Sequence, residues 1–218
     1  MVRTARITGL FYLGLAISGM LGFLLIRPKL FAAGDPAATL ANLTDNPALA
    51  TALVAFELLI VLTQALAAAW FYRLFRPSDP VSGAGIAAFG LVNAVLILIS
   101  AALLSTAGTI AGDPFGDVAN TVQLLFLISG EVWAAGAVFF GLWLIPMGTA
   151  VLRTGLMPQA LGWLLIAAGG GYILSAFFEV DALTIPASIG EFWMIGYLLW
   201  KGVRKGSSAV RLPAPESA

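Results

Sequence analysis

The chain has 218 residues, of which 60% are hydrophobic and 10% are charged. Charged residues make up about a quarter of a soluble domain, so this composition excludes a soluble globule and indicates helices that face lipid. Lys and Arg together number 11, as do Asp and Glu, which gives a net charge of zero. Cysteine and histidine are both absent, which excludes disulfides, Cys or His metal sites, haem ligation by His and His-based catalytic triads.

Long apolar segments predict the membrane-spanning helices, because about 20 apolar residues cross ~30 Å of hydrocarbon. Three runs carry no charge, and three more are interrupted by a single glutamate each. We therefore predict an all-α, polytopic membrane helical bundle with six transmembrane helices. The expected spans are at about 7–26, 48–73, 83–107, 120–152, 158–178 and 184–201, within a single membrane domain at 1–205. The polar, proline-containing segment 206–218 is predicted to be a disordered cytoplasmic tail.

Small residues and caps predict local features along the chain. In the first span, Gly14, Ser18 and Gly22 recur at intervals of four, on one helix face that a neighbouring helix can approach closely. Asp35 before Pro36 has the pattern of an N-cap and a first helical residue, so we expect a short helix on the outer surface in the first loop. The run Gly169 to Gly171 in the fifth span fits helix packing or ligand contact, and packing is the favoured interpretation.

The distribution of positive charge predicts the orientation in the membrane. In a six-span arrangement most Lys and Arg residues fall on one side, and only Arg27 and Lys29, assigned to the first outer loop, fall on the other. This bias is typical of cytoplasmic loops. We expect a multi-pass plasma-membrane protein with both termini in the cytoplasm.

Three glutamates lie within predicted spans that run inward from the outer surface: Glu57, Glu131 and Glu191. Their depths agree, at on the order of 10 to 14 Å below the outer ends of their helices. Tyr172 is expected at the same level, and Gln64 and Asn93 form a second, deeper polar layer. No Lys or Arg lies within the predicted spans to pair with the carboxylates.

These six residues are the candidate intramembrane polar site. An acid within the membrane costs roughly 2.5 to 3.5 kcal/mol on insertion scales, so acids facing the bundle interior suggest a role with a ligand, ion or proton. The alternative is that each glutamate is neutral and joins helices through hydrogen bonds worth about 0.6 kcal/mol. The sequence leaves both open, as it does metal ligation, and it predicts no catalytic residue and no cofactor.

Four segments carry a resemblance to a known family: RITGLFYLGLAISG, GDPAATLANL, VFFGLWLIPMGTAVLRTGLMPQALGWLLIAAGGGYIL and IPASIGEFWMIGYLLWKGV. In order and spacing they resemble the bacterial membrane family catalogued as domain of unknown function 4386, from Arg6 to Val203. The resemblance implies a six-helix fold and no known activity. It includes Glu191, in the IGE segment, and acids at or near Glu57 and Glu131.

The leading functional hypothesis is a carrier or binding protein for a small ligand, an ion or a proton-coupled substrate that uses the carboxylate layer. A non-catalytic accessory protein that packs on a membrane protein partner is the first alternative. A lipid-modifying enzyme is the second, disfavoured because no nucleophile and base, metal cluster or phosphate-binding loop is recognisable. The expected partners are the lipid bilayer and one of these ligands, with no nucleic acid.

Overall fold

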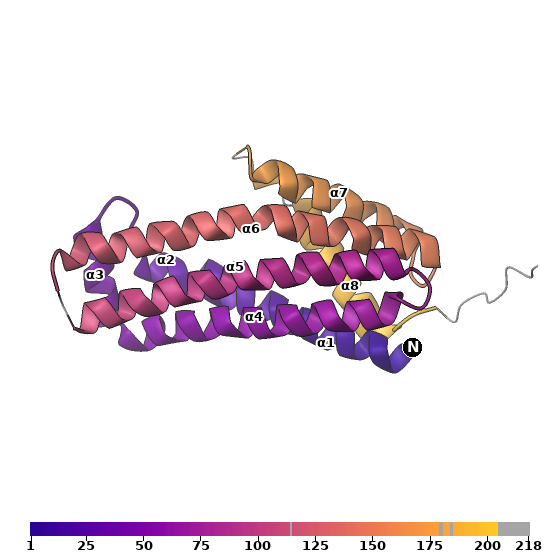
Figure 1. The fold of residues 1–218 in the computed structure, drawn as a ribbon, viewed down its shortest axis with the longest axis horizontal. Helices are drawn as coiled ribbons and strands as arrows, with labels where there is room; N and C mark the ends of the chain where they lie inside the picture. Colours follow the sequence, from indigo (N-terminus) through magenta and orange to yellow (C-terminus); the bar gives the residue numbers. More distant parts are fainter. Residues whose placement is uncertain (114, 179–180, 184, 205–218) are drawn as a thin grey trace, which may run out of the picture.

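The computed structural model describes residues 1–113, 115–178, 181–183 and 185–204, and their regular secondary structure is helical (Figure 1). The elements are α1 (Val2–Gly19), the π-helical η1 (Met20–Ile26), α2 (Arg27–Leu30), α3 (Pro36–Asp45), α4 (Pro47–Phe75), α5 (Pro80–Gly112), α6 (Val118–Thr154), α7 (Gln159–Ser175), the 3-10 turn η2 (Asp181–Leu183) and α8 (Ile185–Trp200). The prediction of an all-α fold is confirmed. The predicted tail at 206–218 lies outside the described residues.

Four helices are long and apolar enough to cross a membrane by length and composition: the continuous Val2–Leu30 helix, α4, α5 and α6. α7 is a shorter apolar helix of 17 residues, and α8 has 16. The chain is thus an apolar helical bundle of the kind that membrane proteins form. Each predicted span coincides with a helix, but α7 and α8 fall short of the ~20 residues that a full crossing takes.

The first helix is longer than predicted. It continues through η1 and α2 to Leu30, so the expectation that Arg27 begins an outer loop is wrong. The sequence places a charge at Arg27 and a proline at Pro28, and both are usual signs of a helix end. Pro28 lies at the start of α2, directly after the π-helical segment η1, where the backbone hydrogen-bond pattern of the helix changes.

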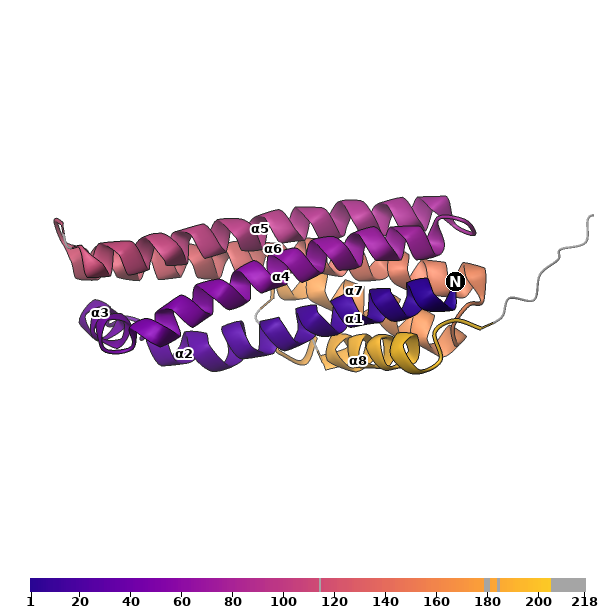
Figure 2. The same ribbon diagram turned by 90° about the horizontal axis from the view of Figure 1, so that it is seen from below.

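The long helices run side by side along the whole bundle, whereas α7 and α8 flank only one half of it (Figures 1 and 2). That half contains the N-terminus and the end of α8, and α3 lies at the opposite end. Each half has its own hydrophobic core. The larger core is built around Tyr12, Phe71 and Trp143, and the smaller core packs Leu43 of α3 against neighbours that include Phe126.

The exposed surface changes character along α4 and α5. On α5 the exposed residues from Leu91 to Ile99 are large aliphatic side chains, and beyond them the exposed residues are small or hydroxyl-bearing, such as Ser105 and Thr109. α4 shows the same change between Ala55 and Leu58. Large aliphatic side chains suit lipid and hydroxyl groups suit water, so these two helices expose a more polar surface toward the α3 end of the bundle.

α3 is the short helix expected from the sequence. The Asp35 side chain accepts a hydrogen bond from the Ala38 backbone N–H at 2.9 Å, which is the predicted cap. Thr39 donates its hydroxyl proton to Oε1 of Gln123 at 2.6 Å, and Nε2 of Gln123 donates to the Ala32 carbonyl at 3.2 Å. These bonds hold α3 against α6 and close the end of the bundle.

Glycines let two pairs of helices approach closely. A Cβ at Gly14 would lie 3.0 Å from Cγ2 of Thr63, and one at Gly22 would lie 2.9 Å from Cβ of Phe56, so the predicted small-residue face of the first helix packs on α4. α6 and α7 are closer still. A Cβ at Gly169 would lie 2.6 Å from the carbonyl oxygen of Gly141, and the pair Gly148 and Gly162 repeats this contact seven residues away.

Asp79 caps α5 at the turn between α4 and α5. Its carboxylate accepts hydrogen bonds from the Ser82 backbone N–H at 3.1 Å and the Ser82 hydroxyl at 2.7 Å, and lies 3.7 Å from Nη1 of Arg153. Burial raises the pKa of the Asp79 carboxyl, but the Ser82 hydrogen bonds and the Arg153 charge outweigh burial and hold this pKa below its ordinary value. The ionised carboxylate therefore joins this turn to the end of α6.

We expect Gly169→Ala to destabilise the protein and Gly170→Ala to leave it unchanged or slightly more stable. The added methyl group at Gly169 collides with the Gly141 backbone, and overpacking of this kind costs about 1 to 3 kcal/mol. Nothing lies within 4 Å of a Cβ at Gly170, where alanine improves helix propensity by up to about 1 kcal/mol. Thermal melting of the purified protein in detergent compares the two, and equal melting temperatures would show that the α6–α7 contact is loose.

Candidate functional site

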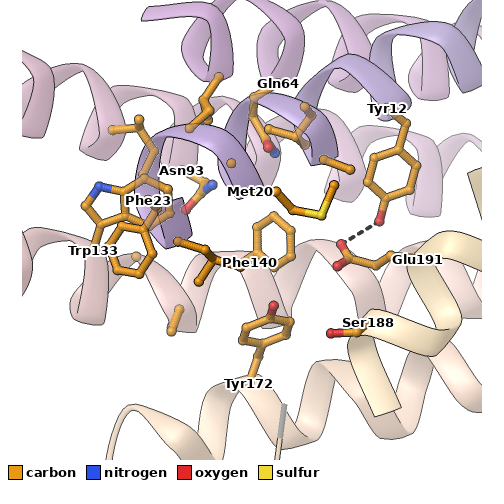
Figure 3. A pocket seen from close by; sticks show the side chains of 18 of the residues that line it. Tyr12, Met20, Phe23, Gln64, Asn93, Trp133, Phe140, Tyr172, Ser188 and Glu191 are labelled. Carbon is orange, nitrogen blue, oxygen red and sulfur yellow. Dashed lines mark hydrogen bonds between the residues drawn. The ribbon is translucent and has the colours of Figure 1, made fainter. Parts of the chain in front are cut away.

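A pocket of about 270 Å³ lies in the bundle, between the long helices, the last turns of α7 and the first turns of α8 (Figure 3). Residues of α1, η1, α4, α5, α6, α7 and α8 line it, and most of them are apolar or aromatic. The polar side chains among them are Tyr12, Gln64, Asn93, Tyr172, Ser188 and Glu191. An apolar pocket with a few polar groups is the usual form of a small-molecule site.

Gln64 is a fully buried pocket residue with unmet hydrogen bonding. Neither Nε2 nor Oε1 of its side chain has a hydrogen-bond partner among the described residues. An unsatisfied buried polar group costs about 1 to 3 kcal/mol. In Figure 3 the amides of Gln64 and Asn93 lie on one side of the pocket, and the Tyr172 and Ser188 hydroxyls point into it from the other. The buried amide of Gln64 therefore has hydrogen-bonding capacity that no described residue uses.

Glu191 is held at the pocket wall by Tyr12. The Tyr12 hydroxyl donates to Oε1 of Glu191 at 2.7 Å, a bond that joins α1 to α8 (Figure 3). The Tyr12 ring meets Phe71 and Trp143 edge-on, at centroid distances of 5.5 and 5.2 Å. Because these contacts leave the tyrosine little freedom, they also fix where the carboxylate lies.

Aromatic rings form much of the remaining wall. Phe23 packs on Trp133 with ring centroids 4.4 Å apart, and Phe140 meets Tyr172 edge-on at 5.0 Å. Phe23 belongs to the π-helical segment η1, which also contributes Met20 and Leu24. π-helical turns inside α-helices occur frequently at functional sites.

The pocket opens sideways, between the first helix and α8. Met20, Leu24 and Phe192 line the pocket and are also exposed on the surface of the bundle, by 40%, 62% and 51%. All three side chains are apolar. An opening with such a border suits a lipid-soluble molecule better than a hydrated one.

Arg27 forms a second polar cluster, near the point on α5 where the exposed surface changes character. Its guanidinium is buried and donates to Oγ of Ser129 at 2.8 Å and to the Phe126 carbonyl at 2.7 Å. The Ser129 hydroxyl shares a further hydrogen bond of 2.8 Å with Ser100. The rings of Phe23, Phe31 and Phe126 lie 5.6 to 6.0 Å from the guanidinium carbon, within cation–π range.

Glu57 lies beside this cluster and apart from the pocket. Its Oε1 accepts a hydrogen bond of 3.1 Å from Nε1 of Trp133, whose ring lines the pocket, and its charge interacts with that of Arg27. Oε2 has no hydrogen-bond partner among the described residues. No Lys or Arg was expected within the predicted spans, but the extension of the first helix brings Arg27 close enough for its charge to act on Glu57.

The structure divides the six predicted site residues into three groups. Four of them line one pocket: Gln64, Asn93, Tyr172 and Glu191. Glu57 belongs to the Arg27 cluster. Glu131 is exposed, because it lies two residues from both Ser129 and Trp133 and so points to the opposite face of α6. The three glutamates do not share one cavity.

Sequence reasoning missed Tyr12, Trp133 and Arg27. Tyr12 and Trp133 are polar aromatic residues inside apolar spans, and each donates a hydrogen bond to a glutamate. Both were visible as possible donors, but pairing them with a particular acid requires the helix arrangement. Arg27 was assigned to a loop because its charge marks the end of the apolar run.

We expect Arg27→Gln to destabilise the protein more than Lys29→Gln. The first change removes a buried charge that makes two hydrogen bonds, and hydrogen bonds to charged groups contribute about 1.5 to 3 kcal/mol. Lys29 is exposed two residues away and serves as the matched control. Melting temperatures in the same detergent check the difference, and equal losses would mean that the Arg27 contacts contribute nothing to stability.

No match to the chain is found among curated proteins or solved structures. The family described as Domain of unknown function (DUF4386) matches residues 7–202, which is most of the chain and includes all the pocket-lining residues. The chain therefore belongs to the DUF4386 family.

Proposed function

We propose that the chain is a six-span plasma-membrane protein that binds a small, largely apolar ligand in the pocket of Figure 3, as a binding protein or carrier. The observation that carries the proposal is the fully buried Gln64 amide, whose two polar atoms have no partner among the described residues. If residue 64 served only to pack helices together, an apolar side chain at this position would make the protein more stable. Hydrogen bonds between this amide and a ligand explain why a polar residue occupies the position.

The shape and lining of the pocket support the same conclusion. Its aromatic walls can bury most of a small molecule, and Asn93, Tyr172 and Ser188 can orient it through a few hydrogen bonds. Glu191 can bind a polar or charged group of the ligand or carry a proton. The Arg27 cluster lacks these features, because Ser129 and the Phe126 carbonyl already bond its guanidinium.

The ligand proposal is tested with Gln64→Leu, which keeps the size of the side chain and removes the amide. We expect this variant to melt at an equal or higher temperature than wild type without ligand, because an unsatisfied group has been removed. We also expect it to lose the thermal stabilisation that a panel of lipid-soluble small molecules produces in wild type, since a ligand that binds the native state raises its stability.

Gln159→Leu is the matched control for this experiment. It makes the same chemical change at an exposed position at the start of α7. It should keep the ligand response of wild type. A panel with no stabilising compound, or an undiminished response in Gln64→Leu, would argue against a ligand-binding pocket.

The proposed orientation places both termini, the α4–α5 turn and the α6–α7 turn in the cytoplasm. The asymmetry of Lys and Arg supports it. At 1.5 Å per residue α7 and α8 reach about 25 Å, so their crossing requires some local thinning of the bilayer or help from the connecting segments.

Single cysteines test this topology, because the chain contains no cysteine of its own. We expect a membrane-impermeant thiol reagent to label Ala37→Cys in intact cells and to label Ser78→Cys only after the cells are opened. Both positions are exposed in the structure. Labelling of Ser78→Cys alone in intact cells would reverse the orientation.

A further inference from the structure

We propose that the ligand of this pocket is an organic cation, an amine or quaternary ammonium group attached to an apolar body, which enters from the lipid. This inference rests on the proposed ligand-binding function and adds the chemical class of the ligand. Glu191, the aromatic wall and the sideways opening carry it together.

The charge of the pocket favours a cation. Glu191 is the acid among the described residues that line the pocket, and no Lys or Arg occurs among them. Tyr12 donates to Oε1 of Glu191, and the described residues offer no hydrogen bond to Oε2. Glu191 is partly buried in an apolar pocket, where a carboxylate without a counter-ion is costly. A ligand with one positive charge supplies that counter-ion, whereas an anion adds repulsion.

The aromatic wall favours a cation with an organic body. The rings of Trp133, Phe140 and Tyr172 lie on the pocket in Figure 3, and aromatic faces attract ammonium groups by up to about 2 kcal/mol when water is excluded. Arg27 shows that rings of this bundle already surround a positive charge, since Phe23 lies 5.6 Å from its guanidinium carbon. A bare metal ion would leave the apolar walls unfilled.

The amides of Gln64 and Asn93 and the opening of the pocket indicate the other chemical groups of the ligand. Gln64 and Asn93 lie across the pocket from Ser188 (Figure 3), where they can bond a hydroxyl or carbonyl group of the ligand. Met20 and Leu24 border the opening toward lipid, and methionine adapts to apolar ligands of different shape. An amphiphilic amine that partitions into the bilayer fits this path better than a strongly hydrated ion does.

The test compares three probes of one shape on the purified full chain in non-ionic detergent. The probes are phenylpropyl-trimethylammonium, its neutral isostere with carbon in place of nitrogen, and a phenylalkyl sulfonate of the same length. Binding is measured by thermal stabilisation and by quenching of tryptophan fluorescence. We expect the cation to bind at least 10-fold more tightly than the neutral isostere, and the sulfonate not to bind.

Glu191→Gln and Glu131→Gln make the same change inside and outside the pocket. We expect Glu191→Gln to bind the cation and the neutral isostere about equally, and Glu131→Gln, on the exposed face of α6, to keep the wild-type preference. Equal loss of preference in both variants would overturn the assignment to Glu191. If Glu191→Gln fails to fold, the comparison of the three probes on wild type decides the question.

The outcomes separate this inference from the proposed function. If the neutral isostere or the sulfonate binds wild type as well as the cation does, the pocket binds ligands but the cation preference is wrong. If no probe binds and no compound of the panel stabilises the protein, both proposals fail.

Discussion

Hydrocarbon offers no hydrogen-bond partner to a polar group, so every polar side chain in a membrane bundle must find its partner within the protein. This constraint accounts for the pairs in the structure. Tyr12 bonds Glu191, Trp133 bonds Glu57, and Ser129 bonds Arg27. Each pair joins two helices, and the donors and acceptors come from parts of the chain far apart in sequence. Against this background the exceptions among the described residues are Gln64, Oε2 of Glu57 and Nε1 of Trp143, and of these three residues Gln64 lines the pocket.

Close packing of glycines determines the shape of the pocket. Because Gly141 and Gly169 bring the backbones of α6 and α7 together, Tyr172 reaches Phe140 across the α6–α7 contact. α8 then packs against both α7 and α1, and the Tyr12–Glu191 bond closes that side. The same packing stops short at the opening of the pocket, which Met20 and Leu24 of η1 and Phe192 of α8 border. Helix packing thus explains both the walls of the pocket and its opening.

The two polar clusters share Trp133, which connects the pocket to the Arg27 cluster. Its ring lines the pocket while its Nε1 donates to Glu57. One side chain therefore contacts both clusters, because its ring and its N–H face different neighbours.

By itself the sequence determined the features that depend on local pattern and composition. These are the all-helical fold, the capped helix after Asp35, the small-residue face of the first helix and the presence of costly polar residues in apolar segments. Which face of each helix points toward its neighbours is decided by the tertiary structure, and the location of each polar residue depends on it. Glu131 and Glu191 look alike in sequence, but one faces outward and the other lines a pocket, because a shift of two residues turns a side chain to the opposite face of a helix. The sequence alone places the charge of Arg27 in a loop outside the membrane. In the tertiary structure Arg27 is buried, because Ser129, the Phe126 carbonyl and the surrounding aromatic rings stabilise its charge.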